Sequence, residues 1–248
     1  MTQTVNEYIK KAKRRKKIKK MFFLFTLILI CAGIIIIYTD LFKIKYISVT
    51  GDNLVTKDYI TEQTKSLKGE NILFISNSKL MNKLKDDPYV KNVEIKRKYP
   101  NSIEIKVTEK KGLFYVQEGE KYKIISCDMD YVEETDSIED RNLIQLKGLD
   151  LSNKKLGDKL EENPRIETLL NNIYVIDQLI ADKSINAQLN SFDITDLSKI
   201  RGYIGEIEVY VGSDENFKNK MVTALGIYEK NIAKKYINVS FDGSPDIE

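Results

Sequence analysis

The strongest pattern in this chain is a basic block followed by a long apolar run. Nine of the eleven residues from Lys10 to Lys20 are Lys or Arg, and no charged residue occurs from Met21 to Thr39. At about 1.5 Å per residue, a helix over this run covers about 28 Å, close to the roughly 30 Å hydrocarbon core of a bilayer. Because backbone polar groups inside lipid must pair with one another, the run predicts one helix that crosses the lipid bilayer over residues 21–39.

The basic block also predicts the orientation of the chain. Lys and Arg are retained on the cytoplasmic side, so residues 1–20 form a cytoplasmic tail and residues 40–248 lie outside the cell membrane. The alternative is a cleaved secretory signal, which has an apolar core of about 7–15 residues and a small-residue cleavage site. Here the run is longer and residues 34–42 offer no such site. We therefore expect an uncleaved, single-pass anchor.

The pattern after the span predicts a unit with the order strand, helix, helix, strand, strand. Residues 43–50 are typical of a strand and residues 57–67 of a helix. A second helix begins at Asn77 or Ser78 and cannot continue past Pro88. Two runs that alternate apolar and charged residues then predict a hairpin with one apolar face. Two helices lying on that face would bury it.

Residues 112–241 predict a second domain of mixed α+β type with an antiparallel sheet. Two amphipathic helices and several short strands alternate in this stretch. The expected elements are a hairpin over 113–118 and 121–126, helices over 165–181 and 217–232, and strands over 188–194, 204–211 and 235–241. Residues 242–248, which contain Gly243 and Pro245, are expected to form a flexible tail. The predicted fold class is therefore α+β.

A series of short motifs resembles the POTRA domain, and more narrowly that of the bacterial cell-division family FtsQ/DivIB. The motifs are Val49-x-Gly51, Gly69-x-Asn71, Leu84-x-x-x-Pro88-x-Val90, Arg97-x-x-Pro100 and Ile103-x-Ile105-x-Val107-x-Glu109, followed by residues 143–149, Leu156-Gly157-Asp158 and residues 236–241. The resemblance implies a POTRA domain over residues 42–110 and an FtsQ/DivIB-type beta domain over residues 112–241. It covers essentially the whole chain.

Charge and composition exclude several classes of function. The net charge of +3 is the sum of +8 in residues 1–20 and −5 in the remainder, which has no basic stripe for nucleic acid. The chain has no His, which removes Ser-His-Asp and Cys-His catalysis and every His-containing metal site. Cys31 lies in the predicted span and Cys127 outside it, so these two residues cannot pair in a disulfide.

Two features of the sequence are candidate sites of chemistry. Ser76-Asn77-Ser78-Lys79 and Ser152-Asn153-Lys154-Lys155 both fit Ser-x-x-Lys, but neither has the partner motifs of penicillin-binding enzymes. The acidic segment 128–140 lacks the glycine-bearing calcium-loop pattern, and we expect a solvated polar loop there. The sequence therefore predicts no catalytic residue, no cofactor, no metal and no small-molecule substrate.

What remains is recognition of other proteins, because an exposed sheet edge can pair with a strand from another chain. The family resemblance implies a divisome scaffold at the division septum. It also implies FtsL-like and DivIC/FtsB-like bitopic coiled-coil partners, the latter bound beside the final strand. The matching residues are Tyr236, Ile237, Asn238, Val239, Ser240 and Phe241. Many relatives carry Asp and Arg where this chain has Asn238 and Ser240, so a salt bridge to the partner is not predicted for this chain, whereas pairing through the backbone stays possible. The alternatives are a core strand without a partner and a membrane-anchored cell-wall enzyme.

Overall fold

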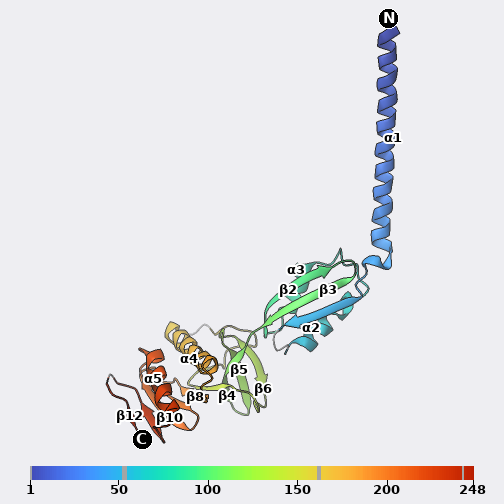
Figure 1. The fold of residues 1–248 in the computed structure, drawn as a ribbon. Helices are drawn as coiled ribbons and strands as arrows, with labels where there is room; N and C mark the ends of the chain where they lie inside the picture. Colours follow the sequence, from blue (N-terminus) through green and yellow to red (C-terminus); the bar gives the residue numbers. More distant parts are fainter. Residues whose placement is uncertain (1, 52–54, 161–162, 242) are drawn as a thin grey trace. The chain divides into compact units, whose positions relative to one another are not determined.

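The structure is a computed structural model that describes residues 2–51, 55–160, 163–241 and 243–248 (Figure 1). The chain divides into two units. The first comprises Met1–Gly51, Lys57–Leu84 and Val93–Val107, and the second comprises Asp52–Thr56, Lys85–Asn92 and Thr108–Glu248.

The first unit begins with the predicted apolar helix. Helix α1 (Thr2–Tyr38) is 37 residues long, and its segment Arg14–Ile37 is long and apolar enough to cross a membrane once. The helix ends where Thr39 N donates to Ile35 O (3.1 Å) and Thr39 Oγ1 donates to the same carbonyl (2.6 Å). The candidate span expected from the sequence is therefore confirmed as a continuous helix.

The remainder of the first unit has the predicted βααββ order. Its elements are η1 (Asp40–Phe42), β1 (Tyr46–Gly51), α2 (Lys57–Thr64), η2 (Lys65–Leu67), α3 (Asn77–Leu84), β2 (Val90–Lys98) and β3 (Ser102–Glu109). The strands lie in the order β1-β3-β2, with β1 parallel to β3. Ile103, Ile105 and Val107 are buried while Glu104 and Lys106 face outward, so the alternation in the sequence sets which face of the sheet is covered.

The second unit is built on one mixed sheet. Among the described residues the strands run in the order β12-β11-β10-β9-β8-β7-β4-β5-β6. The elements are β4 (Gly112–Glu118), β5 (Lys121–Ser126), β6 (Tyr131–Thr135), β7 (Ile144–Lys147), α4 (Pro164–Asp182), β8 (Leu189–Asp193), β9 (Ile200–Ile204), β10 (Ile207–Gly212), α5 (Phe217–Glu229), β11 (Tyr236–Asn238) and β12 (Asp246–Ile247).

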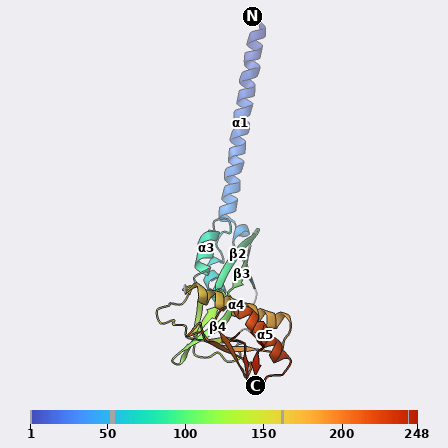
Figure 2. The ribbon, with the colours of Figure 1, turned by 90° about the vertical axis from the view of Figure 1, so that its left-hand side faces the viewer.

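Helices α4 and α5 lie side by side over the sheet and close the core of the second unit (Figure 2). Helix α4 begins where the sequence predicts, with Asn163 Oδ1 accepting from Arg165 N (3.0 Å) and Pro164 in the first turn. Phe192 of β8 and Phe217 of α5 are buried with their ring centroids 5.7 Å apart. Apolar residues of the sheet therefore point toward the helices, and the alternate residues point away from them.

Three details of the second unit differ from the expectation. Residues 204–211 are not one strand, because Gly205 (φ +56°) and Glu206 form a two-residue turn between β9 and β10. The sheet is not antiparallel throughout, since β4 and β7, β7 and β8, and β10 and β11 pair in parallel. The stretch expected to be a flexible tail contains β12, which pairs with β11; residue 242 lies outside the described residues.

The acidic segment is only in part the solvated loop that the sequence predicted: Asp136, Glu139 and Asp140 are exposed outside the strands, while residues 131–135 form β6. Glu133 and Glu134 lie on β6, where Glu133 accepts two hydrogen bonds from Arg141 (2.6 and 3.0 Å) and one from the Tyr89 hydroxyl. Burial alone would raise the pKa of Glu133, but the hydrogen bonds from Arg141 and Tyr89 outweigh it and hold the pKa below its usual value. Glu134 accepts from Lys121 (2.8 Å), which lowers its pKa. These acids are partners in surface ion pairs.

Candidate partner-binding edge of the second domain

The six residues that the family resemblance assigns to partner binding are in three different environments. Ile237 and Val239 are 0% and 5% exposed and belong to the hydrophobic core. Tyr236 and Asn238 are half-buried on the face of the sheet that points away from the helices. Ser240 and Phe241 follow the strand and are exposed, Phe241 to 48%. Only four of the six side chains are therefore accessible from outside the unit.

Strand β11 itself is not the edge of the sheet. It pairs in parallel with β10 on one side, and on the other side Ile237 lies opposite Ile247 and Asn238 opposite Asp246. Glu248 O accepts from Lys235 N (2.6 Å), and Glu248 N donates to Tyr236 O (3.2 Å). The expectation of an open terminal strand is corrected here: the chain covers the edge of β11 with its own last residues.

The edge that β12 presents outward is very short. In an antiparallel pair, residues alternate between those that exchange hydrogen bonds with the partner strand and those that point away. Glu248 exchanges bonds with Tyr236, so the N–H and C=O of the preceding residue, Ile247, point away from β11. Since β12 has only two residues, it offers little backbone for a further strand.

The contacts that hold β12 in place are exposed. Asp246 and Glu248 are exposed and Ile247 is 38% exposed, so the strand buries little apolar surface. The Tyr236 hydroxyl donates to Asp246 (3.1 Å), and this hydrogen bond raises the pKa of Tyr236. Glu248 forms an ion pair with Lys235, and exposed pairs of this kind contribute about 0–1 kcal/mol. Backbone hydrogen bonds therefore provide most of the attachment.

The residues after β11 shape the rest of this edge. Asn238 Oδ1 accepts from Ser240 N (3.0 Å) and Ser240 Oγ (2.7 Å), which forms a turn at the end of β11. Gly212 has a φ of +74°, and a Cβ there would lie 2.8 Å from the side chain of Ser240. Phe241 then lines a shallow pocket of about 270 Å³ together with Pro245 and residues of α5.

The outward face of the sheet beside this edge is rich in aromatic residues. The rings of Tyr210 on β10 and Tyr236 on β11 meet edge to face, with centroids 5.8 Å apart. The Arg201 guanidinium lies 5.2 Å from the centre of the Tyr210 ring, and Tyr203 is 39% exposed. Tyr and Arg are the residue types most often found at the centre of protein interfaces. Of these residues only Tyr236 was predicted from the sequence, although the alternation of Arg201, Tyr203 and Tyr210 with buried Ile and Val marks them as one face.

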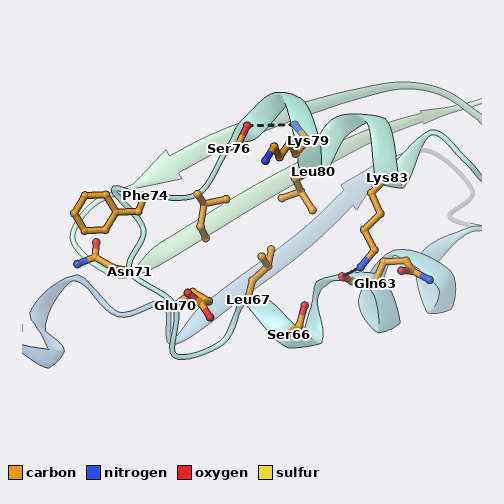
Figure 3. A pocket seen from close by; sticks show the side chains of 11 residues that line it. Gln63, Ser66, Leu67, Glu70, Asn71, Phe74, Ser76, Lys79, Leu80 and Lys83 are labelled. Carbon is orange, nitrogen blue, oxygen red and sulfur yellow. Dashed lines mark hydrogen bonds between the residues drawn. The ribbon is translucent and has the colours of Figure 1, made fainter. Parts of the chain in front are cut away.

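A second hollow lies in the first unit, between α2–η2 and α3 (Figure 3). It holds about 400 Å³, with Phe74 and Asn71 at one end and Gln63 and Lys83 at the other. Ser76 of the Ser-x-x-Lys motif lines it, but its Oγ accepts from Lys79 N (3.4 Å) and contacts Ser78 Oγ (3.1 Å). Ser76 is therefore placed as the cap of helix α3.

The described part of the chain shows no group of three or more Asp, Glu, Cys or His side chains that could hold a metal ion. Cys127 is half-buried, and burial raises the pKa of its thiol. A raised pKa keeps the thiol protonated and less nucleophilic at neutral pH. Backbone edges and exposed surfaces are the candidate binding sites of both units.

The chain is similar to known cell division proteins over most of its length. Residues 42–110 match the domain family described as "POTRA domain, FtsQ-type". The chain is 34% identical over 207 residues to the cell division protein DivIB of Clostridium acetobutylicum, which covers 82% of each protein. It is 30% identical over 247 residues to the cell division protein DivIB of Clostridium botulinum (strain Loch Maree / Type A3), with 98% of this chain and 95% of the relative covered. Similarity to the cell division protein FtsQ of Corynebacterium glutamicum is 23% over 200 residues, or 80% and 84% of the two chains.

Proposed function

We propose that this chain, which belongs to the FtsQ/DivIB family of cell division proteins, is a single-span scaffold that promotes assembly of the division complex. Its N-terminal tail lies in the cytoplasm, both folded units lie outside the membrane, and the protein is found at the septum. Its partners are FtsL-like and DivIC/FtsB-like bitopic coiled-coil proteins. The basic block before α1 supports the orientation, and the family resemblance supports the partners.

The observation that supports this proposal is the way in which β12 covers β11. A partner that adds a strand to this sheet finds little backbone on the outer side of β12. Once β12 leaves, Tyr236 and Asn238 each offer an N–H and a C=O in one row, flanked by the amides of Lys234 and Lys235. The partner segment therefore takes the place of β12 and runs along β11.

The exchange is energetically reasonable because the leaving strand is weakly held. Each backbone hydrogen bond that β12 gives up is replaced by one from the partner, so the number of pairs is conserved. The side chains of β12 bury little, so little hydrophobic stabilisation is lost. A partner strand longer than β12 forms additional backbone hydrogen bonds. It can also cover exposed Phe241 and half-buried Tyr236 beside the edge.

Two variants of the full-length protein test this proposal by their affinity for the partner ectodomain. Deletion of residues 243–248 removes β12 and keeps β11, so affinity should rise or stay the same. Asn238→Pro removes an N–H that points toward β12 and not toward β10, so affinity should fall about tenfold or more. Asn238→Ala is the matched control, because it keeps the backbone N–H and removes only the side chain.

The opposite pattern would overturn the proposal. If the deletion abolishes binding while Asn238→Pro binds like the parent, the partner uses the outer side of β12. If neither variant changes the affinity, the partner binds elsewhere on the protein. Circular dichroism of each variant must match the parent, and this is expected because Asn238 is half-buried and residues 246–248 are exposed.

A further inference from the structure

The first unit exposes aromatic side chains at one end. Outside α1, the aromatic residues of this unit that are largely exposed are Tyr46 (67%), Phe74 (68%) and Tyr99 (59%), counted over its described residues. Burying such a ring in a folded domain is ordinarily favourable by about 1.5–3 kcal/mol. Three exposed rings in a single small unit therefore indicate a surface that is covered by something else.

All three rings are tied to the segment that directly follows α1. Phe74 belongs to a loop in which Ile72 N donates to Phe42 O (2.9 Å) and Glu70 O accepts from Ile44 N (2.9 Å). Tyr99 is in the turn between β2 and β3, where Asn101 O accepts from the amides of Lys45 (2.8 Å) and Tyr46 (3.3 Å). Tyr46 itself begins β1.

The loop is also attached to the end of the apolar helix. Asn71 Nδ2 donates to Ile36 O (2.8 Å), which satisfies one of the carbonyls that a helix leaves unpaired in its last turn. This gives a structural role to Asn71 of the Gly69-x-Asn71 motif. The side chain of Phe74 lies beside Asn71 at the same end of the groove (Figure 3).

The length of chain after α1 keeps Phe42, and the loop hydrogen-bonded to it, close to the membrane surface. Phe42 follows Thr39 by three residues, which span at most about 11 Å when fully extended. The headgroup layer on each side of the hydrocarbon core is roughly 5–7 Å thick. Whatever the direction in which α1 leaves the unit, Phe42 and the loop hydrogen-bonded to it stay within reach of that layer.

We propose that Tyr46, Phe74 and Tyr99 form a membrane-contact collar whose occupant is the phospholipid leaflet from which α1 emerges. Aromatic rings favour the membrane–water interface, where their apolar faces meet the acyl boundary. Exposed Lys45 belongs to the same segment and adds attraction to anionic headgroups, whereas Lys43 is paired with Asp40 (2.7 Å). The collar holds the first unit against the bilayer and so fixes the distance between this unit and the membrane surface. It does not depend on the partner-binding edge.

The absence of tryptophan from the chain makes a direct test possible. Phe74→Trp introduces a single tryptophan into the collar of the full-length protein, which is reconstituted in nanodiscs of phosphatidylethanolamine and phosphatidylglycerol. The matched control is Phe241→Trp, also a Phe-to-Trp change at an exposed site but in the second unit. Tyr99→Trp is a second collar reporter that covers the case in which the Phe74 variant does not fold.

Both collar tryptophans are expected to emit at shorter wavelength in nanodiscs than in the unfolded chain, and lipids brominated near the headgroup should quench them. The Phe241→Trp emission should be unaffected by brominated lipid. Collar emission typical of water-exposed tryptophan would overturn the proposal. So would a blue-shifted emission that brominated lipids leave unquenched, because protein rather than lipid would then cover the ring.

Discussion

Gly202 on β9 has no room for a side chain, and Gly202→Ala should destabilise the second unit. A Cβ built at this position would lie 2.5 and 2.6 Å from Cε1 and Cδ1 of Phe192, which faces Gly202 on the neighbouring strand β8. Ordinary contacts begin near 3.4 Å, so the ring would have to move by roughly 1 Å. Phe192 is fully buried and packs against Phe217, so the movement is transmitted into the core.

The magnitude follows from two opposing contributions. Overpacking a filled core costs about 1–3 kcal/mol, and replacing Gly by Ala recovers about 0.5–1 kcal/mol by restricting the unfolded chain. The midpoints of the two ranges leave a net loss of about 1 kcal/mol. For a unit of about 150 residues, that lowers the melting temperature by about 2–4 °C.

Differential scanning calorimetry of the full-length protein in detergent resolves the transition of the second unit. The matched control is Gly226→Ala in helix α5, where no atom lies within 4 Å of the added Cβ. A helical Gly-to-Ala change without a clash should raise the melting temperature, because Ala favours the helix by about 1 kcal/mol. If Gly202→Ala melts at or above the parent temperature, the packing of Phe192 on Gly202 is wrong.

Two further substitutions test polar contacts. Arg97 donates through Nε to Asn77 Oδ1 (3.2 Å) and through its terminal nitrogens to carbonyls of the loop before α3. Arg97→Lys lacks this fork of donors and should lower the free energy of unfolding of the first unit by about 1–2 kcal/mol, measured by chemical denaturation. Unchanged stability would exclude that role for Arg97. Glu133→Gln should destabilise the second unit by about 1 kcal/mol at neutral pH. Because the pKa of Glu133 is lowered from about 4.5 in the folded protein, its contribution is complete above that value and is lost as the pH falls through the folded-state pKa. The stabilities of parent and variant should therefore converge as the pH falls below the folded-state pKa of Glu133, and a stability gap that is independent of pH would contradict the assignment.

Alternation and turn residues in the sequence were enough to predict the first unit. The runs around Val93 and Ile103 alternate cleanly because one face of β2 and β3 is buried and the other is exposed. The same reasoning located helix α4, where Pro164 and the apolar periodicity agree. The periodicity of apolar residues predicts a helix or strand correctly where the element has one buried face and residues that mark its end.

The second unit shows where that reasoning fails. Residues 204–211 were predicted as one strand because most of them have strand-forming side chains. A Gly and a polar residue between two alternating runs nevertheless indicate a hairpin, and Gly205 forms its turn. Strand β12 could not be predicted in this way. Asp246 and Ile247 are both exposed, so their side chains show no alternation of buried and exposed residues that would indicate a strand. The parallel partners of β7 and β11 are non-local and are set by the whole sheet. The family resemblance implied the candidate residues on and after β11, but nothing in the sequence predicted the strand that covers β11.

Hydrogen exchange on the full-length protein, with and without the partner ectodomain, tests the displacement of β12 most directly. If the partner replaces β12, amides in residues 234–241 gain protection while residues 243–248 lose it, so that two adjacent peptides change in opposite directions. Protection that rises in both peptides, or that changes in neither, would contradict strand exchange at β11.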